Sequence, residues 1–248
     1  IFPGHPCGSV VWDEQAKWTA HGPLRQDVTV LHVAVARLLG YRWPAELDEG
    51  MELSQEQRHW VERCKTLLPH ADEDGIVCIP PVRGEAAAAD RLLDLLVAAY
   101  GPEWTNATLA TLLANADHAG KTLETWLREK FFAQHCKLFQ HRPFIWHIWD
   151  GLRDGFSALI SYHKLDYKNL ETLTYTYVGD WISRQKQDLQ NGLDGAGERL
   201  AAAESLKKKL ELILAGEAPH DIFVRWKALD KQPIGWNPDI NDGVRLNI

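Results

Sequence analysis

The sequence lacks the patterns that mark common redox, metal and membrane proteins. Its four cysteines (Cys7, Cys64, Cys78 and Cys136) are far apart and form no Cys-x-x-Cys pair, so we expect reduced thiols and no disulfide framework. No apolar run approaches the roughly 18 residues that a transmembrane helix needs. The first residues, 1–5, carry neither the basic nor the apolar part of a signal peptide. These absences predict a cytoplasmic protein without membrane contact.

Methionine is also almost absent, since Met51 is the only one and the chain begins at Ile1. We therefore expect a piece cut from a longer protein. The 248 residues, 45% of them hydrophobic and 25% charged, are enough for one large core or two small ones. The 11 tryptophans are compatible with a core, an interface or base stacking, so their number decides nothing about function.

An excess of basic residues is missing as well. The 27 Lys and Arg against 34 Asp and Glu give a net charge of −7. The stretch from Glu46 to Asp74 holds nine acidic and three basic residues, or −6, which leaves the remainder near neutral. Phosphate binding needs clustered cations, so the chain as a whole is a poor candidate for a stand-alone nucleic-acid binder, although local basic patches remain open.

The motifs of nucleotide chemistry are not found. There is no Gly-x-Gly-x-x-Gly after a strand and no phosphate-binding Gly-x-x-x-x-Gly-Lys-Ser/Thr. A DNA amino-methyltransferase needs an Asp, Asn or Ser, two prolines and an aromatic residue to hold the flipped base. Ile79-Pro80-Pro81-Val82 has the prolines without either functional end, and Asn237-Pro238-Asp239 has only the Asn. No catalytic residue is predicted within the chain.

Two groups of polar residues deserve comparison with known chemistry. His135, Cys136 and His141 are spaced so that one helix cannot present them to a single metal ion, and no metal site is expected. His147 and His163 lie near the aspartates of a predicted hairpin loop, which would permit a hydrolase-like His–Asp pair. Aspartates at glycine-containing turns are common, however, and we favour that structural interpretation.

Hydrophobic periodicity predicts a mostly α-helical α+β fold with a central antiparallel hairpin and a helical hairpin toward the C-terminus. The strands of the central hairpin are expected at 144–149 and 156–162, around the loop from Asp150 to Gly155, and a very short strand at 76–79. We expect an N-terminal helical part, 1–120, and a second part, 121–248, which form two domains or one continuous one. Helices are predicted at 26–39, 54–68, 84–100, 107–116 and 122–138, and over the apolar stripes at 170–181 and 200–214. The helix at 54–68 is expected to begin with a capping box of Ser54 and Gln57, and residues 72–75 are expected to form a turn. The first twenty-odd residues are expected to be an extended lead-in, and the residues from 221 an irregular tail.

An ordered series of segments resembles a known family. Lys130-Phe131-Phe132-Ala133-Gln134-His135, then Arg142 to Trp146, then Asp154 to His163 are similar to the C-terminal part of the PglX-type adenine methyltransferases of BREX phage-defence systems. Related DISARM and type IIG methylases look similar there too. Segments at 71–77, 173–177 and 241–247 extend the resemblance.

The resemblance implies a parent enzyme that methylates adenine N6 in a short DNA sequence, using S-adenosylmethionine bound N-terminal to this region. The chain itself is then a non-catalytic segment without a cofactor. It is expected to help position double-stranded DNA within the parent; the alternative is docking or spacing, against the remaining methyltransferase domains or other defence-system subunits. An independent hydrolase is a third and weaker reading. The expected DNA contacts are Lys130, Lys137, Arg142, Arg153, Lys164 and Lys168, although each alone is more simply explained as a solvated surface residue.

Overall fold

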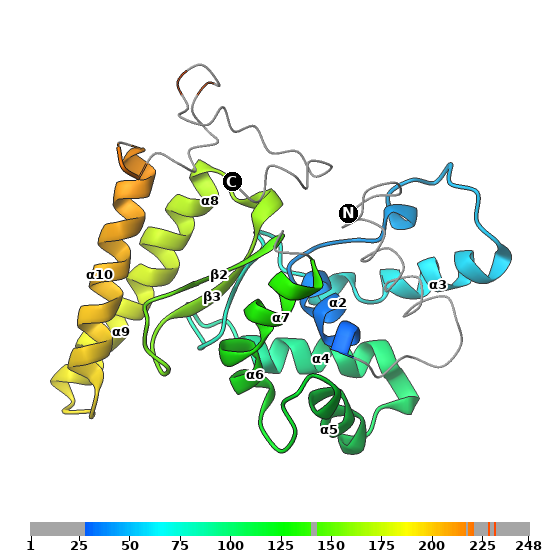
Figure 1. Cartoon of the computed structure of the whole chain (residues 1–248), viewed down its shortest axis with the longest axis horizontal. Helices are drawn as coiled ribbons and strands as arrows, with labels where there is room; N and C mark the ends of the chain where they lie inside the picture. Colours follow the sequence, from blue (N-terminus) through cyan, green and yellow to red (C-terminus); the bar gives the residue numbers. More distant parts are fainter. Residues whose placement is uncertain (1–27, 140–142, 217, 221–227, 229–230, 232–248) are drawn as a thin grey trace.

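The computed structural model describes residues 28–139, 143–216, 218–220, 228 and 231. In these residues a small antiparallel sheet lies between two groups of helices, which lie on either side of it in Figure 1. The predicted mostly helical α+β class is confirmed. No helix in the described ranges is long and apolar enough to cross a membrane.

The sheet is built from the predicted hairpin and one additional strand. Strands β2 (Ile145–Trp149) and β3 (Ser157–Ser161) pair antiparallel, with His147 opposite Leu159. Strand β1 (Ile76–Cys78) pairs with the other edge of β3, with Val77 also opposite Leu159, so the order is β1-β3-β2. The hairpin and the short strand were both predicted, but the pairing of β1 with β3 was not.

Alternate residues along the strands face two different cores, as the pleat of a strand requires. Val77 and Leu159 face a large core, and their neighbours Ile76 and Ile160 face a smaller one. All residues of β1 and β3 are buried, so these two strands are covered on both faces, whereas β2 is partly exposed. The sheet is therefore the shared layer that joins the two halves of the fold.

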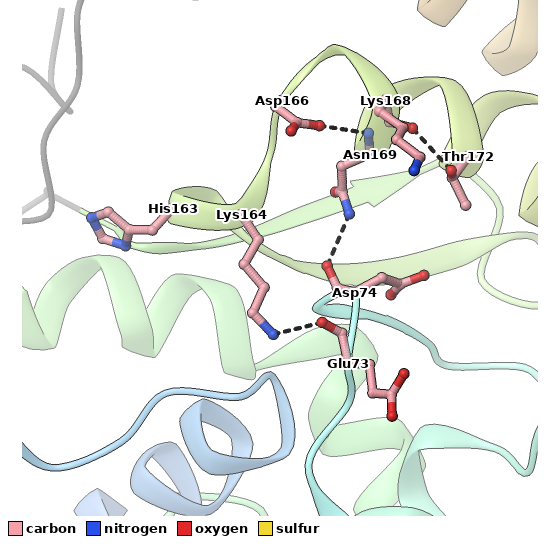
Figure 2. Close-up of a pocket in the computed structure, with 8 residues that line it drawn as sticks. All are labelled: Glu73, Asp74, His163, Lys164, Asp166, Lys168, Asn169 and Thr172. Carbon is pink, nitrogen blue, oxygen red and sulfur yellow. Dashed lines mark hydrogen bonds between the residues drawn. The ribbon is translucent and has the colours of Figure 1, made fainter. Parts of the chain in front are cut away.

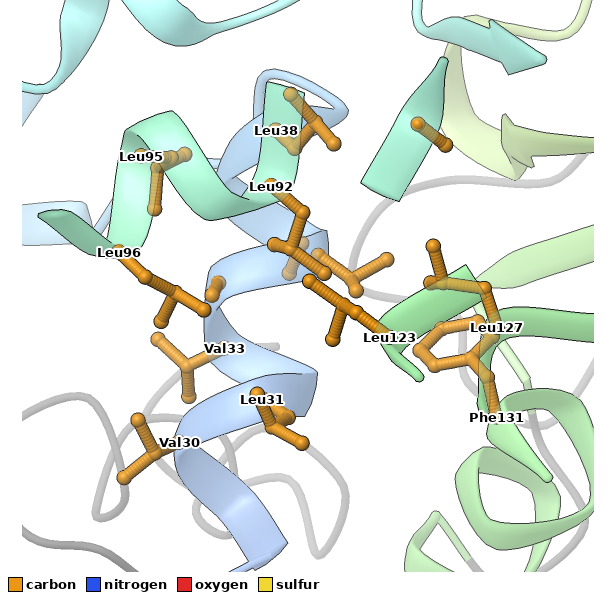
Figure 3. Close-up of a cluster of buried hydrophobic side chains, with 14 of the residues drawn as sticks. Val30, Leu31, Val33, Leu38, Leu92, Leu95, Leu96, Leu123, Leu127 and Phe131 are labelled. Carbon is orange, nitrogen blue, oxygen red and sulfur yellow. The ribbon is translucent and has the colours of Figure 1, made fainter. Parts of the chain in front are cut away.

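The larger core packs five helices against one face of the sheet. Figure 3 shows its centre, where leucines and valines of the first two of these helices meet Leu123, Leu127 and Phe131. His32 and His135 are buried within this cluster beside Phe131. The helices are α2 (Val28–Leu38), α4 (Ala88–Tyr100), α5 (Asn106–Asn115), α6 (Leu123–Glu129) and α7 (Phe131–Leu138).

The smaller core packs the predicted helical hairpin against the opposite face. One arm runs from α8 (Tyr167–Glu171) through a π-helical turn (Thr172–Tyr177) into α9 (Val178–Gln190), and α10 (Ala196–Ala215) returns beside it. Helix α3 (Gln55–Lys65) lies apart from both cores, and its predicted capping box is confirmed by reciprocal bonds between Ser54 and Gln57 of 2.9 and 3.2 Å.

Two expectations about helix boundaries were wrong. The single long helix predicted at 122–138 is interrupted at Lys130, whose φ of −120° ends α6 and whose neighbour Phe131 turns in against the ring of Trp126. The helix predicted from Gly84 begins only at Ala88. Residues 82–85 instead form a turn in which Arg83 and Gly84 have φ of 57° and 76°, values that a right-handed helix excludes.

Several expectations fall outside the described residues. They include the extended lead-in at 1–27, the ligand candidate His141, the contact candidate Arg142 and most of the irregular tail from 221. The division into an N-terminal part, 1–120, and a C-terminal part, 121–248, stays a prediction. The larger core draws on both of these parts, since Leu38 and Leu92 share it with Phe131.

Candidate functional site

The structure brings together two of the six predicted DNA contacts. Lys164 and Lys168 line a pocket of about 490 Å³ on one side of the sheet. Figure 2 shows how the turn before β1 and the segment after β3 meet there. The lining residues carry both signs of charge: Glu73, Asp74, His163, Lys164, Asp166, Lys168, Asn169 and Thr172.

The Lys164 side chain holds two distant segments together. Its Nζ donates to the backbone carbonyls of Asp72 and Glu73, at 3.1 and 3.0 Å. It passes so close to Gly40 and Gly75, which both have positive φ, that a Cβ on either would lie less than 3.0 Å from it. Burial lowers the pKa of Lys164. An ammonium has three donors, so two of the three are engaged within the protein.

Asp72 organises the turn that forms one wall of the pocket. Its Oδ1 accepts from the backbone N–H groups of Asp74, Gly75 and Ile76, at 2.7 to 3.2 Å, and its Oδ2 accepts from Arg91 at 2.9 Å. Burial by itself would raise the pKa of Asp72, but the contacts with Asp74 and Arg91 hold it below its usual value. The predicted turn at residues 72–75 is thus a carboxylate-capped entry into β1.

Asp74 belongs to a chain of polar groups that links this turn to the helical hairpin. The Tyr177 hydroxyl lies 3.0 Å from Asp74 Oδ2 and 3.2 Å from Glu85 Oε1, and Glu85 is 3.6 Å from Arg91. Burial, together with the neighbouring Asp72, raises the pKa of Asp74 to about 6. Burial and the two carboxylates also raise the pKa of Tyr177. The hydroxyl is therefore neutral and bridges two acids.

Three of the other predicted contacts, Lys130, Lys137 and Arg153, do not line this pocket. Lys130 Nζ lies 3.4 Å from Asp117, and Arg153, in the hairpin loop, pairs with Glu129. Lys137 is exposed on α7, and Lys168 is exposed at the pocket. As contacts to DNA, all of these stay predictions.

The polar residues of the hairpin have structural partners. His147 Nε2 lies 2.6 Å from Ser157 Oγ, and burial lowers the pKa of His147 to about 4. Asp150 accepts the N–H groups of Leu152 and Phe156, at 3.0 and 2.7 Å, as a turn aspartate does. Asp154 pairs with Arg199 of α10 at 2.9 Å. A histidine that is neutral and bonded across the strand pair is a poor match for the His–Asp pair considered above.

Metal ligation finds no support in the described ranges, where no group of three or more His, Cys, Asp and Glu side chains is arranged to hold an ion. Buried His135 accepts the Ile145 N–H at 3.2 Å through Nε2, which is a structural role.

Sequence reasoning missed the residues that bond to the turn before β1 and to one another. Arg91 and Glu85 were assigned to a helical segment, and Tyr177 was assigned to an apolar stripe. The available signal was an arginine in an otherwise Ala- and Leu-rich helix, close to a cluster of acids. That signal indicates that Arg91 needs an acidic partner, but it does not say which acid the partner is.

Comparison with known proteins gives one informative similarity. No family model matches the chain. It is 24% identical over 124 residues, 48% of the chain, to a protein described as adenine-specific methyltransferase PglX from Lacticaseibacillus casei (strain Zhang). The matched part is 10% of that protein, so the chain spans only a small share of the relative's length. This likeness points to a methyltransferase-related protein.

Proposed function

We propose that this chain is a non-catalytic part of an adenine-specific DNA methyltransferase and helps to position double-stranded DNA for the enzyme. The observation that carries the proposal is the similarity to the PglX protein over about half of the chain. The methyl donor, S-adenosylmethionine, would be bound by another part of the parent protein. A phage-defence setting and a cytoplasmic location are further parts of this proposal.

The organisation of the polar residues favours a non-catalytic role. His147, Asp150 and Asp154 each bond to groups that hold the hairpin or its neighbours in place. The Asp74–Tyr177–Glu85 chain likewise joins the turn before β1 to the helical hairpin. Groups engaged in this way maintain a shape, which is what a DNA-positioning segment needs.

Binding of a fluorescent DNA duplex to the 248-residue chain tests the proposal, measured by anisotropy from 50 to 200 mM salt. We expect an affinity that falls steeply with salt, because cations that contact phosphates release counterions. Lys137→Ala and Lys168→Ala should each weaken binding without shifting the melting temperature, since both side chains are exposed. Absence of binding at 50 mM salt would refute DNA positioning by this chain.

Docking to the remaining methyltransferase domains or to other defence-system subunits is a second candidate. It is favoured by the pairing of predicted DNA contacts with acids of the same chain, as in Lys130–Asp117 and Arg153–Glu129. Leu189 and Leu193, each about half exposed near the turn between α9 and α10, offer an apolar contact. Co-elution with the rest of the parent protein that is lost in a Leu189→Ser and Leu193→Ser double variant supports docking, and separate elution of the wild-type chain contradicts it.

A further inference from the structure

An arginine occupies a backbone position that favours other residues. The turn at 82–85 is closed by a bond of 2.9 Å from Glu85 N–H to Val82 O. Positive φ at both central residues, 57° at Arg83 and 76° at Gly84, is the pattern of a type I′ turn. Gly, Asn and Asp dominate such positions because a larger side chain is strained there. A strained surface residue suggests that its side chain is needed where the turn directs it.

The Arg83 side chain is held in a defined place. Its guanidinium carbon lies 5.2 Å from the centre of the Tyr177 ring, and its backbone N–H donates to Asp180 Oδ2 at 2.9 Å. Tyr177 is itself buried and bonded to Asp74 and Glu85, so the ring beneath the guanidinium is fixed. Stacking on an aromatic face reduces the freedom of a guanidinium while leaving its N–H groups available.

Arg184 is held beside the same loop in a similar way. Its Nη1 donates to Pro81 O at 2.9 Å, and its guanidinium carbon lies 5.8 Å from the Trp181 ring. Tyr177, Trp181 and Arg184 follow one another at four- and three-residue spacing and share one face of the helix. The two supporting rings are therefore about 6 Å apart along its axis. Arg83, from the loop, and Arg184, from the helix, thus lie over two rings of one helix face.

Neither of these arginines is paired with a carboxylate in the part of the chain that the structure describes. Both residues are exposed, and neither takes part in a salt bridge there. Two acids close to them in the chain have other partners: Asp180 accepts the Arg83 backbone N–H, and Glu85 faces Arg91 and the Tyr177 hydroxyl. Arg153 and Lys130, in contrast, are paired with Glu129 and Asp117.

We propose that Arg83 and Arg184 together bind the phosphate backbone of double-stranded DNA. This inference rests on the proposed DNA-positioning function and adds contacts that the resemblance did not suggest. Planar guanidiniums donate to phosphate oxygens in pairs, and side chains already fixed by stacking lose little freedom on binding. The contact reads no base, so it should hold the duplex independently of its sequence.

Duplex binding by Arg83→Asn and Arg184→Ala variants, with Arg58→Ala as the control, tests the inference. Asparagine tolerates the left-handed backbone, so Arg83→Asn removes the charge without adding strain. Arg58 is an exposed arginine of α3 for which the described residues provide no ion pair. We expect each of the two test variants to bind about five- to tenfold more weakly at 50 mM salt, with the salt slope reduced by about 1. Their melting temperatures should stay within a few degrees of the wild type.

The outcomes separate this inference from the function on which it rests. Wild-type binding that neither variant weakens would overturn the arginine contacts and leave DNA positioning in place. An equal loss in Arg58→Ala would also overturn them, because overall charge would then explain the effect. Equally tight, arginine-dependent binding of polyglutamate would point to an acidic protein partner instead and overturn the DNA assignment. A wild-type chain that binds no duplex at 50 mM salt would overturn both proposals.

Discussion

Replacing Asp74 with Asn should make the protein more stable at neutral pH. The Tyr177 hydroxyl has one proton and lies between two carboxylates, 3.0 Å from Asp74 and 3.2 Å from Glu85. It can donate to only one of them at a time. If Asp74 is protonated, it donates to the Tyr177 oxygen and the hydroxyl donates to Glu85, so every bond is made. An Asn amide can donate permanently in the same place while its carbonyl accepts the Ile76 N–H.

The size of the effect follows from the pKa of Asp74, raised from 3.8 to about 6 by burial and by Asp72. A carboxyl with a raised pKa stabilises the folded state most below the unfolded pKa, and this contribution is lost as the pH rises through about 6. The full shift of about 2 would correspond to about 3 kcal/mol. Asp74 is only half-buried, and solvent screening reduces the expected gain for Asp74→Asn to about 1 to 1.5 kcal/mol above pH 7.

Urea unfolding of wild type and Asp74→Asn between pH 4 and 8 measures the gain. The difference in unfolding free energy should be near zero at pH 4 and reach its full value above pH 7, while contributions from other titrating groups cancel. Asp94→Asn, which removes an exposed carboxylate of α4, controls for the change in net charge. A difference that is independent of pH, or equal in the control, would refute the argument from the shared hydroxyl.

Three further substitutions test other parts of the fold. Arg37→Ala leaves Glu46 unpaired in a site where both side chains are 3% exposed, so urea unfolding should show a loss of about 3 to 5 kcal/mol; a loss below 1 kcal/mol would contradict this. Burial lowers the His32 pKa from 6.5 to about 4, so His32 contributes stability above pH 6.5 that is lost as the pH falls toward 4. Between pH 7.5 and pH 5, the free energy of unfolding should therefore fall by about 2 kcal/mol less in His32→Leu than in wild type. Equal falls in the two proteins would contradict this. Gly155→Ala places a Cβ 2.2 Å from Asp150 Oδ1 and should lower stability by about 1 to 3 kcal/mol in thermal unfolding. Gly151→Ala is the comparison, because its Cβ would meet open space and only its positive φ would cause strain.

Sequence patterns predicted the structural elements that residues close together in the chain determine. The hairpin from Ile145 to Ser161 needed only two β-rich runs and a glycine-containing loop, and its strands begin and end within one residue of expectation. The capping box of Ser54 and Gln57 was likewise visible in a four-residue pattern. Such features depend on neighbours in the chain, so the sequence alone was sufficient.

Features that depend on distant residues could not be predicted. Strand β1 has only three residues and acquires its role by pairing with β3, some eighty positions later. The candidate pocket requires Lys164 to reach the carbonyls of Asp72 and Glu73, and two glycines far apart in sequence to leave space for it. From the sequence alone, Lys164 is therefore predicted to be a surface charge, although its hydrogen-bond partners lie within the protein.

The same contrast explains why net charge alone does not say which cations a fold leaves accessible. An acidic chain can still present cations that form no salt bridge with its own acids, as Arg83 and Arg184 do among the described residues. Conversely, a cation is less available to a phosphate when it already faces a carboxylate, as Lys130 and Arg153 do. The relevant quantity is the number of cations that the fold leaves accessible and fixed. By that criterion the turn at 82–85, which delays the start of the predicted helix to Ala88, is also the feature that makes Arg83 a candidate contact.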